Sequence, residues 1–154
     1  MSHLYEAAVQ TPSITAVIPV ATVVAGAQRA EVRELCVSTA VTASLATILV
    51  GRPAVAGAGA LTGALVQATD SADAAGLTTL VAGPTNSGFG TSAPTAPAVA
   101  MRQFVLNGTA AGGGVVFAWE PGELVIPASG QLVVWLLLSG GGAITFDVFA
   151  KVAE

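Results

Sequence analysis

The stretch AITFDVFAKV, residues 143–152, alternates apolar and polar side chains and predicts a half-buried β-strand. A period of two places one set of side chains against a core and the other set toward water or a partner. The apolar set consists of Ile144, Phe146, Val148, Ala150 and Val152. Phe149 falls among the polar residues of the opposite face, which makes it a candidate contact with another subunit.

The preceding stretch QLVVWLLLS, residues 131–139, is apolar on both faces of the expected strand. One face carries Leu132, Val134, Leu136 and Leu138, and the other carries Val133, Trp135 and Leu137. An antiparallel strand of this kind is covered on both sides. Either a long loop or a neighbouring subunit supplies the second cover, so Trp135 is a candidate interface residue. The three glycines at 140–142 predict a tight hairpin to the last strand.

The rest of the chain, which contains 18 Gly and 8 Pro in all, reads as short strands separated by turn residues. Strands are expected near residues 31–41, 43–50, 61–69, 77–82, 101–106, 115–119 and 124–126. Asn107-Gly108 predicts another hairpin, and residues 83–97 form a long loop of low complexity. We therefore predict an all-β fold, a single-domain antiparallel β-sandwich of jelly-roll type with about 8 to 10 strands.

Residues 1–30 are expected to stand apart from this sandwich domain, which would span residues 31–154. The segment is apolar and β-branched, as an extended N-terminal arm or an edge strand would be. No charged residue occurs between Glu6 and Arg29, so we expect a neighbouring subunit to cover the segment. Its candidate contact residues are Val17, Ile18 and Val20.

Charge is scarce throughout the chain. The 154 residues include 5 Lys or Arg and 9 Asp or Glu, whereas 53% are hydrophobic. A soluble domain usually carries about a quarter charged residues, so we infer that neighbouring subunits cover part of the surface. A membrane is not expected as the cover, because no window supplies the roughly 20 consecutive apolar residues of a spanning helix. A net charge of −4 with scattered cations excludes the basic stripe that nucleic acid requires.

Side chains that perform chemistry are nearly absent. His3 is the single histidine and Cys36 the single cysteine, so neither a Ser-His-Asp set nor a His/Cys metal cluster can be assembled. Cys36 lies between Leu35 and Val37 and is expected to be a small buried hydrophobe. The first basic residue, Arg29, follows the apolar segment, so we expect no signal peptide.

Two carboxylate pairs remain to be explained. Glu120 and Glu123 flank Pro121-Gly122 and fit a solvated turn better than an acid–base pair. Asp70 and Asp73 fit an Asx-type turn better than a calcium loop, because most oxygen ligands of such a loop are missing. We therefore expect no catalytic residue, no cofactor and no metal, and we predict that the protein is not an enzyme.

The run WEPGELVIPASGQLVV, residues 119–134, carries a resemblance to a known class of proteins. With the glycine-rich turn, the last strand and Glu154, it resembles the ending of small β-sandwich virion proteins of tailed bacteriophages, especially phages of high-GC actinobacterial hosts. Their pattern joins W-x-P-G-E and (V/I)-P-A-G-G-x-L-V to a final strand and an acidic residue. Ser129 stands where that pattern usually has glycine.

The resemblance implies a structural subunit of the virion, by preference a capsid decoration (cement) protein on the capsid exterior, made in the host cytoplasm. Its partners would be the major capsid protein and copies of itself, with a homotrimer preferred and a pentamer as the alternative. A tail or baseplate component is an alternative function. A carbohydrate-binding jelly roll that uses Trp119, Glu120 and Phe89 is another. An enzyme of cupin type is disfavoured, because such sites use several histidines as metal ligands.

Overall fold

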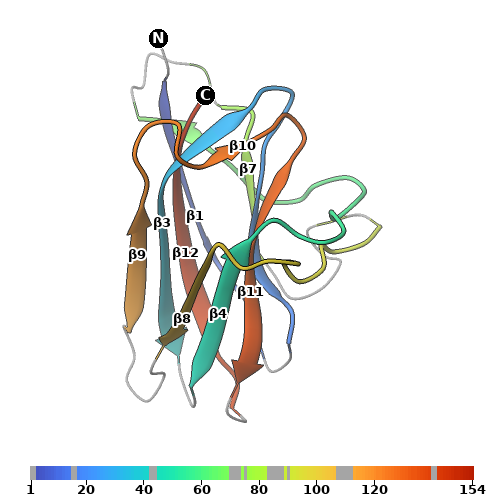
Figure 1. Cartoon of the computed structure of the whole chain (residues 1–154), viewed down its shortest axis with the longest axis vertical. Helices are drawn as coiled ribbons and strands as arrows, with labels where there is room; N and C mark the ends of the chain where they lie inside the picture. The colour runs from blue at the N-terminus through green and yellow to red at the C-terminus, as the bar shows by residue number, and fades with distance from the viewer. Residues whose placement is uncertain are drawn as a thin grey trace.

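The computed structural model describes residues 3–14, 17–41, 45–69, 74, 76–82, 89, 91–106, 113–139 and 142–154. These residues form twelve strands, arranged as two antiparallel sheets that pack face to face (Figure 1). The all-β sandwich predicted from the alternating segments is confirmed. Within these ranges, no helix has the length and apolar character needed to cross a membrane.

Each sheet is built around one of the last two strands. Sheet I contains β1 (Leu4–Gln10), β3 (Ala30–Val41), β6 (Gln67–Ala68), β9 (Gly114–Ala118), β10 (Val125–Ile126) and β12 (Thr145–Ala153). Sheet II contains β2 (Pro19–Val24), β4 (Ala46–Gly51), β5 (Ala64–Leu65), β7 (Thr79–Ala82), β8 (Arg102–Leu106) and β11 (Gln131–Ser139). In sheet I, β12 lies between β1 and β3, and β9 and β10 both pair with β3. In sheet II the order is β5-β7-β2-β11-β4-β8.

Eight of these strands have the connectivity of a jelly roll. The order β1-β12-β3-β9 faces the order β2-β11-β4-β8, so the chain passes from one sheet to the other at nearly every connection. Two predicted hairpins are therefore wrong. β11 and β12, which flank Gly140–Gly142, lie in different sheets, and so do β8 and β9, which flank Asn107-Gly108. Residues 107–112, 140 and 141 themselves lie outside the described residues.

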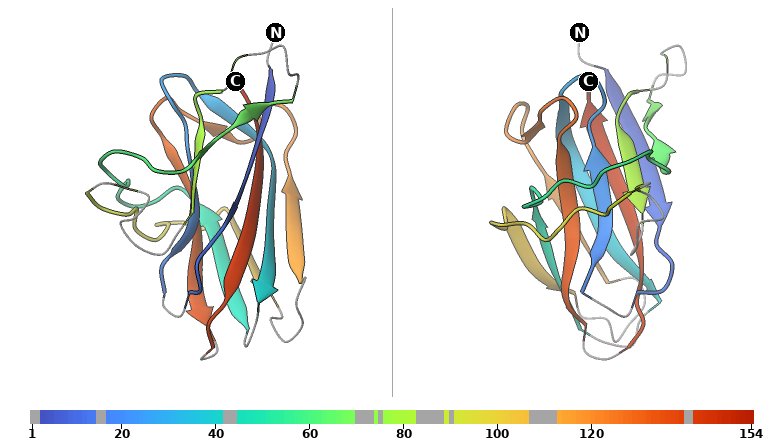
Figure 2. Two further views of the ribbon diagram at one scale, coloured as in Figure 1. Left: turned by 180° about the vertical axis from the view of Figure 1, so that it is seen from behind. Right: turned by 90° about the vertical axis from the view of Figure 1, so that its right-hand side faces the viewer.

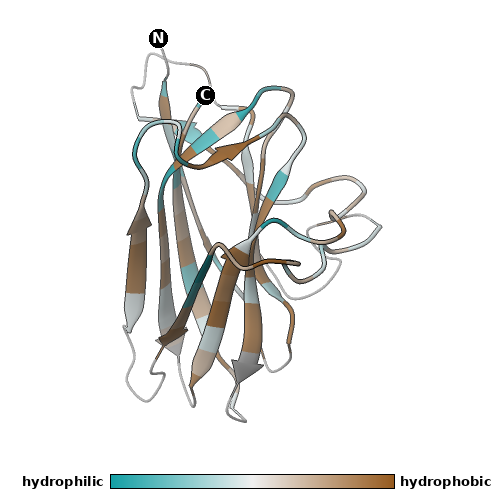
Figure 3. Cartoon of the chain, viewed as in Figure 1, coloured by the Kyte–Doolittle hydropathy of each residue, from teal (hydrophilic) through white to brown (hydrophobic). Residues whose placement is uncertain are grey.

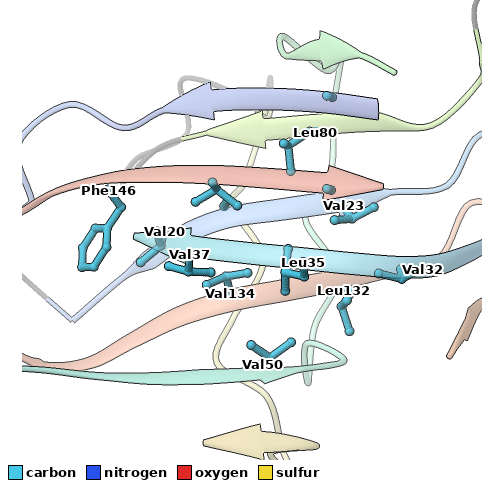
Figure 4. Close-up of a cluster of buried hydrophobic side chains, with 14 of the residues drawn as sticks. Val20, Val23, Val32, Leu35, Val37, Val50, Leu80, Leu132, Val134 and Phe146 are labelled. Carbon is cyan, nitrogen blue, oxygen red and sulfur yellow. The ribbon is translucent and has the colours of Figure 1, made fainter. Parts of the chain in front are cut away.

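The predicted apolar faces of the last two strands fill the space between the sheets. The buried residues are Leu132, Val134 and Leu136 of β11 and Phe146, Val148, Ala150 and Val152 of β12. They belong to one cluster that draws on both sheets, as Figure 4 shows for Val134 beside Leu35 and Val37. Burying a side chain of this kind stabilises the fold by about 1.5–3 kcal/mol. A slip of one residue would turn the whole set outward, so this burial also fixes the register of both strands.

Residues 4–14 and 17–24 are part of the sandwich. β1 pairs with β12 along its whole length, and β2 lies inside sheet II between β7 and β11. The predicted arm, and with it a domain boundary at residue 30, is therefore wrong for the described part of this segment. The alternative to an arm was an edge strand, and β1 comes close to being one. On the side away from β12, only two of its residues pair, with β6. The segment lacks charge because both strands pack into the chain's own core, where Val20 and Val23 are fully buried.

Two irregular segments, one after β4 and one before β8, cross the outer face of sheet II (Figure 2). Isolated bridges hold the two segments antiparallel and join Pro53 to Pro97, Ala58 to Ser92 and Leu61 to Phe89. We call the described residues of 53–61 and 89–97 the ribbon. The single strand expected at 61–69 is divided into β5 and β6, because Val66 between them turns into the core.

Candidate interaction surface

The outer face of sheet I is polar, and its charges have partners. Lys151 Nζ lies 3.1 Å from Glu6 Oε1, and Gln10 Nε2 donates a 2.8 Å hydrogen bond to Asp147 Oδ1. Glu34 stands opposite Lys151 in the ladder between β3 and β12. Interspersed charges of both signs are what an ordinary solvated surface carries.

Phe149 lies in an apolar row across this polar face. Its ladder partners are Ala8 on β1 and Cys36 on β3, and Val116 of β9 continues the row beyond Cys36. Phe149 is half-buried and lines an open hollow of about 330 Å³ together with Ala8 and Cys36. Phe149 therefore projects from the predicted face of β12.

The prediction that Cys36 is a buried core residue is wrong. Leu35 and Val37 are fully buried, and the period of two turns the residue between them to the opposite face. Cys36 is half-buried there. Burial, and then the negative charge of Glu34, raise the pKa of the Cys36 thiol, so the reactive thiolate is scarce at neutral pH.

The outer face of sheet II differs sharply from that of sheet I, because its described residues include no charged side chain. From the register, the face presents Thr22, Val24, Thr47, Leu49, Thr79, Val81, Gln103, Val105, Gln131, Val133, Trp135 and Leu137. Arg102 is the single charged residue in the strands of sheet II, as far as the structure describes them. Its side chain turns toward sheet I, 6.0 Å from the Trp119 ring centre and 3.7 Å from Glu123. Figure 3 shows β4 in brown and near-white, without the strong teal of a charged residue.

The ribbon covers the half of this face that lies near Gln131. The Gly57 N–H donates to Gln131 Oε1 at 2.8 Å, and Gln131 Nε2 donates to the Gly57 carbonyl oxygen at 2.9 Å. Phe89 of the ribbon packs against Val24 and Val81, and Val133 beneath is fully buried. Of the two covers expected for the outer side of β11, the long loop is confirmed for this half.

The other half of the face is open. Leu137 is 43% exposed and Val105 is 61% exposed, and Leu49 and Trp135 beside them are half-buried. We call these four residues the open face. Val17 and Leu45 precede β2 and β4 at the same end of the sheet, and both are largely exposed. The open face and its rim thus form an uncharged apolar surface that nothing in the described part of the chain covers.

The five contact residues predicted from the sequence do not form one patch. Trp135 belongs to the open face and Val17 to its rim, but Phe149 lies on the opposite outer face. Ile18 is half-buried and packs against the core. Val20 is fully buried where the register of β2 against β11 shifts, so its side chain cannot reach another subunit.

Sequence reasoning missed three members of the open face as contact residues. Leu137 was detectable, because it alternates in phase with Trp135 along β11. Leu49 and Val105 were not detectable from the sequence, because nothing in their own strands marks either residue as a surface contact. They join the surface through cross-strand pairs, Trp135 with Leu49 and Thr47 with Val105.

Glu120 and Glu123 bracket a tight turn, as predicted. The Glu123 N–H donates to the Glu120 carbonyl oxygen at 3.0 Å, and Gly122 has a φ of 80°, which is the geometry of a type II turn with Pro121 before Gly122. The Glu123 carboxylate accepts a 3.1 Å bond from the Glu120 N–H. The pair therefore holds the turn together.

The remaining candidate ligand sites receive no support. Asp70 and Asp73 lie outside the described residues. Elsewhere in the described chain, no three His, Cys, Asp or Glu side chains gather as a metal site would require. Trp119 is 7% exposed and Phe89 is 3% exposed, so neither ring has a free face for stacking against a sugar.

No family model and no curated protein matches the chain. Among solved structures, a chain of the structure described as "KBV activated particle at acidic pH" is similar to it, with 9% sequence identity and a TM-score of 0.28. The match covers 88% of this chain and 48% of that chain, so this chain spans about half the length of that protein. A likeness at this level carries no argument about function.

Proposed function

We propose that this chain is a non-enzymatic structural protein of a bacteriophage virion, a decoration protein that binds the capsid exterior as a homo-oligomer. The observation that carries the proposal is the difference between the two outer faces of the sandwich. Sheet I presents paired charges to water, whereas the described residues on the outer face of sheet II carry no charge and leave an apolar half open. The cores of interfaces are depleted of charged residues in this way.

The fold and the sequence resemblance support the same class of function. Jelly rolls occur in viral capsid proteins and lectins, and the buried rings of Trp119 and Phe89 disfavour the lectin alternative. The run that resembles phage virion proteins contains two turns of special backbone geometry. Gly122 has a φ of 80°, and Ser129 has a φ of 59° at the position where the pattern usually has glycine.

The test is binding to capsids. The purified chain is mixed with capsid shells of the phage that encodes it, and bound protein is separated on a density gradient. We expect co-sedimentation at a fixed ratio to the capsid protein. Leu137→Lys should weaken binding by about tenfold or more, because an ammonium buried without a partner in an interface costs several kcal/mol. Val116→Lys is the matched control, since Val116 is an exposed valine on sheet I.

The outcomes separate the remaining alternatives. Binding to isolated tails and not to shells would replace the decoration role with that of a tail or baseplate component. Binding to neither particle, by a chain that is a stable monomer, would contradict the proposal. Equal loss of binding in both variants would show that the open face is not the contact surface.

A further inference from the structure

The two sides of the sandwich end in very different edge strands. On one side the sheets end in β5 and β6, which have two residues each. The chain passes directly from β5 in sheet II to β6 in sheet I, and Val66 between them is fully buried. Short edges of this kind leave few backbone groups for another chain to pair with.

On the other side, sheet II ends in β8, an edge of five residues. Among the strands that the structure describes, β8 pairs with β4 alone, from Ala46↔Leu106 to Val50↔Arg102. Natural edge strands are usually protected by proline, lysine or a bulge, and the sequence RQFVL has none of these. Its one charge, on Arg102, is directed to Glu123 and Trp119.

The surroundings of β8 are apolar and exposed. Val99 is 78% exposed, Val105 61% and Met101 39%. Val105 is at the same time a member of the open face, so the free edge and the open face are continuous. The edge strand β9 of sheet I has Val116 as its one large exposed apolar residue. A partner that pairs with β8 would therefore bury more apolar surface than one that pairs with β9.

We propose that two copies of this chain pair through their β8 strands, antiparallel and across a two-fold axis, so that sheet II continues from one copy into the other. Head-to-tail pairing is disfavoured, because the opposite edge of sheet II has two residues where β8 has five. A strand paired with its own copy meets an edge of equal length, as an isologous interface requires. The inference concerns copies of this chain alone, and it does not depend on the virion role.

The pairing that uses all of β8 centres on Phe104, the middle residue of the strand. It places Gln103 opposite Val105 of the second copy, and Arg102 opposite Leu106 of the second copy. The two Arg102 residues then lie four residues apart along the strands, about 13 Å, which exceeds the screening length of about 8 Å at physiological ionic strength. No like charges are forced together. A two-fold contact produces a dimer or an assembly of dimers, in place of the trimer that the sequence resemblance implies.

The first experiment measures self-association by analytical ultracentrifugation. We expect twice the chain mass of 15.1 kDa for the natural protein. The double variant Gln103→Lys with Val105→Lys should lose dimerisation, because it sets lysines directly opposite one another. The double variant Gln103→Glu with Val105→Glu should lose it for the same reason. Mixing the two variants should restore a dimer, which a misfolded chain could not do. Val116→Lys, the control on β9, should remain dimeric.

The second experiment tests the register. In a Cys36→Ser background, a chain with Gln103→Cys is mixed with a chain carrying Val105→Cys under mild oxidation. Opposite residues in an antiparallel pair have Cα atoms about 4.5–5.5 Å apart, within reach of a disulfide. We expect disulfide-linked heterodimers in preference to either homodimer. A monomeric or trimeric natural protein, a dimer that survives both double variants, or a preference for the 103–103 link would each overturn the inference.

Discussion

The side chain of Gln131 is the connection between the ribbon and sheet II that is most directly testable. It is buried and exchanges two hydrogen bonds with the backbone of Gly57, at 2.8 and 2.9 Å. Gln131→Ala removes both bonds and leaves the N–H and C=O groups of Gly57 without these partners. Each net hydrogen bond contributes about 0.5–1.5 kcal/mol, so we expect the free energy of unfolding to fall by about 1–3 kcal/mol.

The assay is equilibrium unfolding in urea, with Gln28→Ala as the matched control. Gln28 is an exposed glutamine between β2 and β3, so its replacement should change stability by less than about 0.5 kcal/mol. Hydrogen exchange should also show faster exchange at Gly57 in the Gln131→Ala variant, because the ribbon is no longer held there. Equal stability of the two variants would refute the reasoning, since the ribbon would then be held by packing alone.

Three further predictions concern single residues. Ser129→Val should lower the free energy of unfolding, measured in urea, by about 1–2 kcal/mol. Ser129 has a φ of 59°, and a β-branched residue is strained in that conformation. Unchanged stability would contradict the strain argument. Phe146→Ala should lower the free energy of unfolding by about 3–5 kcal/mol, because Phe146 is fully buried in the core. Phe149→Ala on the outer face should lower it clearly less in the same assay. Equal losses of stability would contradict the assignment of the two residues to opposite faces of β12. The Cys36 thiol should react with maleimide at neutral pH more slowly than a free cysteine, because its raised pKa lowers the thiolate fraction. Glu34→Gln should speed the reaction. An unchanged rate in this variant would show that Glu34 does not act on the thiol.

The sequence predicted what depends on alternation along one strand. The inward residues of β11 and β12 follow from a period of two, and so does the outward position of Phe149. The same period also shows, once Leu35 and Val37 are buried, that Cys36 must face outward, so that error was avoidable. The turn at Pro121-Gly122 was predictable because its geometry is local.

What the sequence did not predict depends on partners far along the chain. The glycines between β11 and β12 resemble a hairpin, but no local signal tells that these strands belong to different sheets. The stretch that includes β2 has no alternation that separates an arm from an interior strand, and the register shift beside Trp135 decides that Val20 is buried. The ribbon has no periodicity, so its position over Val133 follows from contacts such as that of Gln131 with Gly57.

The position of β12 between β1 and β3 has a consequence for the order of events during synthesis. β1 and β3 cannot be joined in sheet I until residues 145–153 have also been synthesised. Synthesis proceeds at about 5–20 residues per second, and pairings between such distant segments form slowly. The joining of β1 to β3 therefore waits for a strand far along the chain, although β3 can pair with β9 and β4 with β8 before that strand is made. We expect chains shortened before β12 to aggregate, because sheet I then lacks the strand that joins β1 to β3.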